Sequence, residues 1–230
     1  MAIIAALAVF VGFAPTYYLK GLYGTPRLST VRHLHGIVFT LWMILFLVQT
    51  TLISAHRPSW HRRLGIAGTG LAGAMLIVGT AVAIAAARHP QPVQVVAAGF
   101  PPPLVFLLIP LTDLVAFAVL AGSGLYNRRK PASHKRLMLL ATIAILPAAL
   151  GRMVFPGGVL DFLHLPVAPL TLTGLTALFV GACLIYDRLS HGRVHPATVW
   201  GGAFLLTAQV LRLFVAGTAV WLAIARWLTS

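Results

Sequence analysis

Seven long apolar stretches, separated by short polar segments, constrain the fold of this chain more than any other feature. A helix that rises about 1.5 Å per residue needs about 20 apolar residues to cross a hydrocarbon layer of ~30 Å. The predicted spans are residues 2–19, 33–54, 64–87, 103–122, 136–155, 166–186 and 198–217. The sequence therefore predicts an all-α fold, a polytopic transmembrane bundle of seven helices that forms a single domain over residues 1–230.

The composition excludes the other large classes of protein. Hydrophobic residues make up 59% of the chain and charged residues only 9%, whereas a typical soluble domain is about 25% charged. A soluble enzyme, a disordered chain and a secreted disulfide scaffold are therefore excluded. Cys183 is the only cysteine, so the chain cannot form an internal disulfide, a four-cysteine metal site or a C-x-x-C-H haem attachment.

The few acidic residues limit the chemistry further. The chain has 17 Lys and Arg residues but only three acids, Asp113, Asp161 and Asp187, and its net charge is +14. Catalysis by paired carboxylates is nearly excluded, because it needs at least two acids at one place. We interpret the basic surplus as orientation signals and contacts with lipid headgroups, not as a nucleic-acid surface, because the chain contains no soluble basic module.

The basic residues are distributed unequally between the two sides of the predicted bundle, and Lys and Arg favour the cytoplasmic side. The loops beside the second, fourth and sixth spans carry Arg57, Arg62, Arg63, Arg128, Arg129, Lys130, Lys135, Arg136, Arg188 and Arg193. The opposite side carries Lys20, Arg27, Arg32, Arg88 and Arg226. We therefore expect the first group, and the N-terminus, to lie in the cytoplasm.

Local sequence features modify three of the spans and the tail. The third span is rich in small residues, which allow close helix packing and predict a central position. Pro110 and Pro147 lie inside the fourth and fifth spans, where each removes a backbone donor and is expected to kink its helix. The tail, residues 218–230, either extends the seventh helix or lies along the membrane interface as a short amphipathic piece.

The chain contains an internal repeat. Residues 58–64 and 131–137 share a Pro-x-x-His-basic-Arg-Leu pattern, and in each case the pattern begins the second helix of a predicted hairpin. Both copies fall on the same predicted side of the membrane. The simplest interpretation is a parallel duplication of a two-helix unit, which pairs the second and third helices with the fourth and fifth.

The repeated histidines have alternative interpretations. In a structural role, each His hydrogen-bonds the adjoining loop and the basic pair lies among lipid headgroups. In a functional role, His61 and His134 supply both axial metal ligands of a b-type haem, as two histidines at equal depth do in helical bundles. Arg62 and Arg136 would then hold the haem propionates. The pattern also allows other ligands.

Several motifs occur together in the first two thirds of the chain. They are His33-Leu34-His35-Gly36, Gln49, His61-Arg62-Arg63-Leu64-Gly65, His134-Lys135-Arg136-Leu137-Met138 and Gly151-Arg152. As a set they resemble an uncharacterised bacterial family of small multi-helix membrane proteins, a domain of unknown function with paired His-basic motifs. The resemblance covers residues 32–152. The family has Trp-Met where this chain has Leu137-Met138.

The resemblance implies a multi-pass protein of the bacterial inner membrane. The family is also distantly similar in architecture to haem-bearing b-type membrane cytochromes. It therefore implies association with haem or with a respiratory complex, and no particular activity. The histidine spacing of this chain does not reproduce a full set of four haem ligands.

Ionisable residues inside an apolar span are costly, so each is a candidate for function. We expect Asp113 to lie at a depth where it could pair with Arg212, or with Arg152 if Pro110 kinks the helix. A structural ion pair between Asp113 and Arg212 is the preferred interpretation. One acid cannot neutralise two guanidinium groups, so the remaining positive charge could attract a haem propionate, a quinone oxygen, a carboxylate or a lipid phosphate.

The outer side also carries histidines. We expect His35 to face the bundle and His164 to lie opposite it, at the start of the sixth span. His35 with His164, or with His89, could ligate a second, outer haem, although a single interfacial histidine is more often a hydrogen-bonded cap.

Two functions of different classes follow from these residues. The first is a membrane redox protein that binds b-type haem and takes part in electron transport with quinone. The alternative is a non-catalytic membrane subunit or assembly factor that contacts other subunits of a larger complex. A transporter of anions or amphiphiles that uses Arg152 and Arg212 is a third option.

Overall fold

The computed structural model describes residues 1–89, 101–154, 157–165 and 169–230, and those residues form helices and connecting turns without a β-strand. The helices are α1 (Ala2–Phe13), α2 (Thr30–Ser54), α3 (Pro58–Ala87), α5 (Pro103–Phe106), α6 (Leu108–Tyr126), α7 (Pro131–Ala144), α8 (Pro147–Val154), α9 (Pro169–His191), α10 (Pro196–Val215) and α11 (Ala219–Thr229). A π-helical segment, η1 (Ala14–Tyr18), follows α1, and a 3₁₀ turn, η2 (Asp161–Leu163), precedes α9. The predicted all-α fold is confirmed.

The number of membrane spans differs from the expected seven. Among the described residues, five helices are long and apolar enough to cross a membrane: α2, α3, α5 together with α6, α9 and α10. The bent pair α7 and α8 makes a sixth if it is one span. The first apolar stretch forms only the shorter helix Ala2–Tyr18. The chain therefore has the helices of a multi-pass membrane protein, with its first apolar stretch below spanning length.

Both prolines inside the spans disturb their helices, as expected. Between α7 and α8 the axis bends by 42°. Just before Pro147 the Leu146 amide donates to Ile143, three residues back, at 3.0 Å, because the helix tightens where proline cannot donate. The break between α5 and α6 lies at Leu107, three residues before Pro110.

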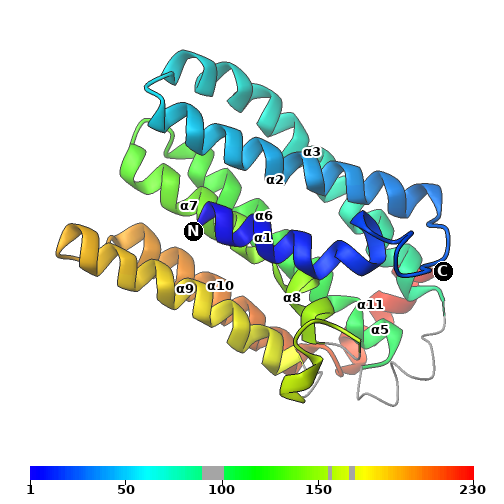
Figure 1. Cartoon of the computed structure of the whole chain (residues 1–230). Coiled ribbons are helices and arrows are strands. Elements are labelled where there is room, and N and C mark those ends of the chain that lie inside the picture. Colours follow the sequence, from blue (N-terminus) through cyan, green and yellow to red (C-terminus); the bar gives the residue numbers. More distant parts are fainter. Residues whose placement is uncertain (90–100, 155–156, 166–168) are drawn as a thin grey trace.

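Three helical hairpins pack side by side to form the bundle (Figure 1). They are α2–α3, α6–α7 and α9–α10; α3 packs on α6, and α10 packs on both α6 and α7. The short α1 packs on α8. At the centre, Trp42 of α2 meets Phe117 of α6 edge to face at 4.9 Å, and its Nε1 donates to Thr142 Oγ1 of α7 at 3.3 Å. These contacts join the first two hairpins, and the core cluster extends into the third through Val180, Cys183 and Leu205.

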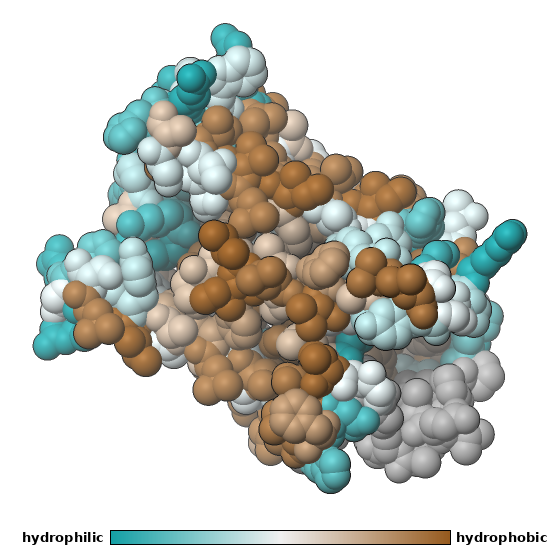
Figure 2. Space-filling model, viewed as in Figure 1, coloured by the Kyte–Doolittle hydropathy of each residue, from teal (hydrophilic) through white to brown (hydrophobic). Residues whose placement is uncertain are grey.

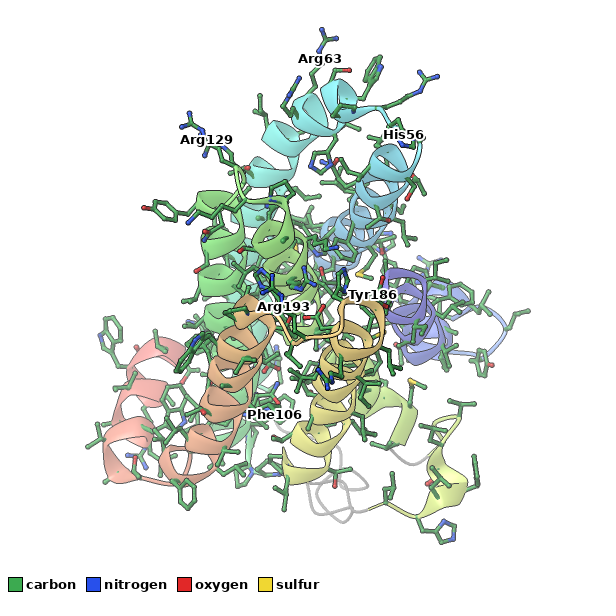
Figure 3. All side chains as sticks on the ribbon, turned by 90° about the vertical axis from the view of Figure 1, so that its left-hand side faces the viewer. His56, Arg63, Phe106, Arg129, Tyr186 and Arg193 are labelled. Atoms are coloured by element: carbon green, nitrogen blue, oxygen red, sulfur yellow. The ribbon has the colours of Figure 1, made fainter. Side chains whose placement is uncertain are left out.

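The turns of all three hairpins lie at the same end of the bundle (Figure 1). Figure 3 looks at that end and labels Arg63 near the start of α3, and Arg129 and Arg193 in the turns of the other two hairpins. We call this the basic end; its exposed cations are Arg57, Arg62, Arg63, Arg128, Arg129, Lys130, Lys135, Arg188 and Arg193. A hydrophobic belt separates hydrophilic residues at the two ends of the face seen in Figure 2. This distribution is typical of a bundle that spans a bilayer.

The tail forms a helix of its own and does not continue α10. The hydroxyl of Thr218 caps α11 by accepting from the Trp221 amide at 3.2 Å. Trp221 Nε1 donates to the Leu104 carbonyl of α5 at 2.8 Å. At the other end of α11, Arg88 donates to the carbonyls of Thr229 and Ser230 at 3.1 and 2.9 Å. These bonds hold α11 against α5 and the end of α3.

The expected central position of α3 is wrong. Only 17% of the apolar window of α3 is buried, against 44% for the α5–α6 span. Gly68 does allow close packing, because a Cβ there would lie 2.9 Å from a methyl of Leu45. At Gly70 and Gly73, however, a Cβ would meet nothing within 4 Å. The small residues therefore pack α3 against α2 on one side and leave its other side uncovered.

The contact between α1 and α8 gives a testable prediction. A Cβ at Gly12 would overlap the carbonyl oxygen of Ala149, so Gly12→Ala must push the two backbones apart. We expect the free energy of unfolding to fall by about 1–3 kcal/mol, measured by unfolding in mixed detergent micelles. Gly181→Ala is the matched control, because its Cβ would meet nothing; it should be neutral or stabilising by up to about 1 kcal/mol. Equal effects of the two substitutions would contradict this packing.

Candidate functional site

The two copies of the repeat begin their helices in the same way. Pro58 and Pro131 occupy the first turn of α3 and α7. An amide N–H at that position has no partner within the helix, so proline, which has none, is well accommodated there. The residue before each proline is a cation with nearly the same backbone, φ −113° and ψ 61° at Arg57, and φ −113° and ψ 86° at Lys130. Proline disfavours the helical region for the residue before it. The sequence repeat is therefore also a repeat of local structure.

This shared geometry brings the two repeated histidines together. The ring centroids of His61 on α3 and His134 on α7 lie 6.1 Å apart, with an angle of 87° between the ring planes. Both rings are partly buried at the basic end. Two residues far apart in sequence thus form one imidazole pair between two hairpins.

A backbone carbonyl fixes the orientation of His134. Its Nδ1 donates to the Gly124 carbonyl oxygen of α6 at 2.8 Å. Since a carbonyl can only accept, the proton is on Nδ1 and the Nε2 lone pair is available. Gly124 makes the approach of the helices tight at this point, because a Cβ there would lie 2.9 Å from the Met138 sulfur. The backbone therefore prepares His134 as an acceptor or a metal ligand.

Gln49 completes what we call the histidine cluster, with His61 and His134. Its Nε2 donates to the His61 carbonyl at 3.2 Å. Within the described residues, the buried atoms Gln49 Oε1 and His61 Nδ1 have no hydrogen-bond partner. No set of three or more His, Cys, Asp or Glu side chains in the described part of the chain could hold a metal ion. The cluster therefore offers two imidazoles and an amide.

Arg136, the expected partner of a haem propionate, is fully engaged by an acid. Its Nε donates to both carboxylate oxygens of Asp187, at 3.0 and 2.9 Å, and its Nη2 donates to Oδ1 at 2.5 Å. Its Nη1 donates to the Ala132 carbonyl at 2.8 Å. Both side chains are buried. All three guanidinium nitrogens are thus used inside the protein, which leaves Arg62, exposed on α3, as the free arginine expected at this site.

The Asp187 carboxylate joins three helices and was not among the expected site residues. Besides Arg136 of α7, it accepts from Thr198 Oγ1 of α10 at 2.5 Å and from the His195 amide at 3.3 Å. His195 in turn caps α10, because its Nδ1 accepts from the Ala197 amide at 3.1 Å. Burial, together with the positive charge of Arg136, lowers the pKa of His195 from its ordinary value. The ring therefore stays neutral and able to accept at neutral pH.

The structure also joins Asp113 and Arg212, on α6 and α10. Arg212 Nη1 lies 2.6 Å from Asp113 Oδ1 and 3.3 Å from the Ile109 carbonyl. Arg212 Nε and Nη2 have no hydrogen-bond partner among the described residues. Gln209, one turn earlier, lies beside the Asp113 carboxylate, but neither of its amide atoms reaches hydrogen-bond geometry with a described group. This buried centre is therefore only partly satisfied.

Arg152 lies elsewhere, away from this ion pair. Its guanidinium lies over the Phe13 ring of α1 at 4.3 Å, and its Nη1 donates to the Ala148 carbonyl at 2.6 Å. Its charge acts on His35 of α2, so the two expected outer site residues are neighbours. The cation of Arg152 has no carboxylate partner in the described part of the chain.

The expected pair of outer histidines is not brought together. The His35 ring lies 4.1 Å from Phe39, one turn along α2. His164 is exposed in the turn after η2, where its Nδ1 hydrogen-bonds the Asp161 carbonyl at 3.0 Å. Among the described ring contacts, none joins His35 to His164 or to His89. The imidazole pair at the basic end is therefore the stronger candidate site.

Comparison with known proteins gives no family assignment: no family model, no curated protein and no solved structure matches this chain.

The Arg136–Asp187 pair gives a second prediction. Asp187→Leu alone leaves a buried guanidinium unpaired and should lower the free energy of unfolding by about 3–5 kcal/mol. Adding Arg136→Met should recover a large part of that loss, because the unpaired charge is then removed. Unfolding in mixed micelles measures both, with Arg193→Met, an exposed cation at the same end, as a control expected within about 0.5 kcal/mol of wild type. Losses that simply add would contradict a direct pair.

Proposed function

We propose that this chain is an integral membrane protein that binds one b-type haem through His61 and His134 and takes part in electron transfer with quinone. In this proposal it lies in the bacterial inner membrane, with its basic end on the cytoplasmic side; since Ala2–Tyr18 is below spanning length, the N-terminus is not placed on that side with it. We also propose that the chain belongs to the uncharacterised bacterial family of multi-helix membrane proteins that its paired His-basic motifs resemble.

One observation carries the proposal: the imidazoles of His61 and His134 come from equivalent positions of two repeated hairpins and lie 6.1 Å apart. Bis-histidine ligation in a helical bundle needs two imidazoles on facing helices at equal depth. A purely structural pair would not need equivalent positions in both copies of a repeat. The repeat thus favours a ligand that both histidines share.

The donor atoms of the cluster fit an imidazole-bound metal group. Metal-ligating histidines usually donate their other ring nitrogen to a carbonyl or carboxylate, as His134 Nδ1 does to Gly124. His61 Nδ1 is buried without a partner among the described residues, so a buried lone pair or N–H of this ring remains to be satisfied. Iron held by two imidazoles supplies one-electron oxidation and reduction.

The residues around the histidines would bind and shield the group. Arg62 and Lys135 are exposed cations that directly follow the two histidines in sequence, so they are the side chains proposed to pair with propionates. Arg136 would act indirectly, because its bonds to Asp187 and to the Ala132 carbonyl hold the first turn of α7 and so the position of His134. Gln49 would help to position His61, because its side-chain Nε2 donates to the backbone carbonyl of His61.

A second function, a non-catalytic subunit or assembly factor, is favoured by a different observation. Of the five long spans among the described residues, those of the α2–α3 hairpin are the least covered, with 22% and 17% of their apolar windows buried. Ile66 and Ile77 on α3 are 77% and 74% exposed, and Gly70 and Gly73 leave open space beside them. A helix of another membrane subunit could pack closely there.

An absorption spectrum tests the haem proposal directly. Protein purified in detergent from haem-replete cells should show a Soret band that shifts on reduction with dithionite. His61→Ala and His134→Ala should each abolish the band, because each removes an axial ligand. His56→Asn is the matched control, since His56 is an exposed histidine at the same end, and it should keep the full band.

Colourless wild-type protein that is folded and free of iron would refute haem binding. If that colourless protein also co-purified with other membrane subunits in mild detergent, and if Gly70→Leu abolished the association, the second function would be correct.

A further inference from the structure

The contact between α6 and α10 contains a second polar centre, which the proposed function does not use. It consists of Asp113, Gln209 and Arg212, and we call it the α6–α10 centre. The three residues are 6%, 0% and 2% exposed. They lie in helices long and apolar enough to cross a membrane, so bulk water cannot complete their hydrogen bonds.

The α6–α10 centre has more hydrogen-bonding capacity than the protein uses. A guanidinium has five N–H donors, and the described bonds of Arg212 all use Nη1. Nε and Nη2 therefore keep their donors unpaired within the described residues. Gln209 adds an amide that lies beside the Asp113 carboxylate without either amide atom reaching full hydrogen-bond geometry with a described group. Buried polar groups are nearly always satisfied, so these donors point to a partner beyond the described residues.

The charge of the centre limits what that partner can be. Asp113 neutralises Arg212 at 2.6 Å, and Arg152, the other cation expected nearby, lies against Phe13 instead. The centre is therefore close to neutral overall. A free anion would have to displace Asp113 or add an uncompensated charge in an apolar surrounding. A neutral group with carbonyl oxygens can accept from Arg212 and Gln209 without either cost.

A small apolar cluster lies near the α6–α10 centre. Leu107, two residues before the Ile109 carbonyl that Arg212 contacts, packs in a small apolar cluster with Trp221 of α11. Trp221 itself is tied to α5 through Leu104. A short piece of broken helix and the Trp221 side chain therefore lie close in sequence and space to the Ile109 carbonyl that Arg212 contacts.

We infer that the α6–α10 centre binds the carbonyl headgroup of a neutral, lipid-soluble ligand of the quinone class, with Arg212 and Gln209 donating to a ring carbonyl. The ligand fits the three properties of the centre: unpaired donors, near neutrality and a position within the apolar spans. The inference rests on the proposed function only for the electron-transfer role of the ligand. Binding itself requires no haem.

Binding of decylubiquinone to the purified full-length protein in detergent tests this inference. Quinones quench tryptophan fluorescence at short range, so titration should give saturable quenching, most of which is lost in Trp221→Phe. Gln209→Met removes the amide at nearly constant volume and should weaken the quinone by about tenfold. Gln49→Met makes the same change in the histidine cluster and should leave the affinity unchanged.

Folding of the variant is checked without quinone. Because Gln209 lies beside the Asp113 carboxylate without reaching full hydrogen-bond geometry, Gln209→Met should melt within about 2–4 °C of the wild-type temperature. Equal quinone affinity in wild type and Gln209→Met, or quenching that does not saturate, would overturn the inference; the centre would then hold buried water only. Because His61→Ala should abolish the Soret band and leave quinone affinity intact, failure of either proposal is seen separately.

Discussion

The shortage of acids in an apolar bundle determines how this protein is held together. The chain has 17 basic residues and three acids, and two of those acids are buried, each against one arginine. Asp187 pairs with Arg136 and Asp113 pairs with Arg212. Since Thr198 near the start of α10 also bonds Asp187, and Arg212 lies about 21 Å further along the helix, α10 is fixed to its neighbours near both ends.

The first hairpin, α2–α3, is attached to the rest of the bundle in a different way. This distinguishes the surroundings of the histidine cluster from those of the α6–α10 centre. No buried ion pair among the described residues joins α2 or α3 to the rest. They are joined by apolar packing and by neutral or singly charged hydrogen bonds, among them Trp42–Thr142 near the core and those of Arg88 with the carbonyls at the end of α11. The histidine cluster therefore lies at the junction between a loosely covered hairpin and a firmly fixed one. A ligand shared by His61 and His134 would add a further link across this junction.

The sequence predicts the all-α class, the proline breaks and the equivalence of the two repeated segments, because each follows from local spacing. It also indicates the depth of Asp113 and Arg212. It does not predict that Arg136 meets Asp187, because that contact depends on which hairpins become neighbours. In the sequence, Asp187 looks like a residue of a polar loop, whereas the structure places it in the last turns of α9. The presence of one acid among many cations nevertheless indicated that it would form an ion pair. The exposure of α3 was missed because small residues indicate close packing without saying with what.

The central claim is that the repeated hairpins bring His61 and His134 together, and cross-linking in native membranes tests it most directly. The variant carries His61→Cys, His134→Cys and Cys183→Ala, with a protease site inserted between the two hairpins. A short bismaleimide should join the two new cysteines, so that the chain still runs as one band on a denaturing gel after proteolytic cleavage. His89→Cys with His134→Cys should not be joined, because residue 89 lies about 42 Å from residue 61 along α3. Two bands from the 61–134 pair, or one band from the 89–134 pair, would contradict the account.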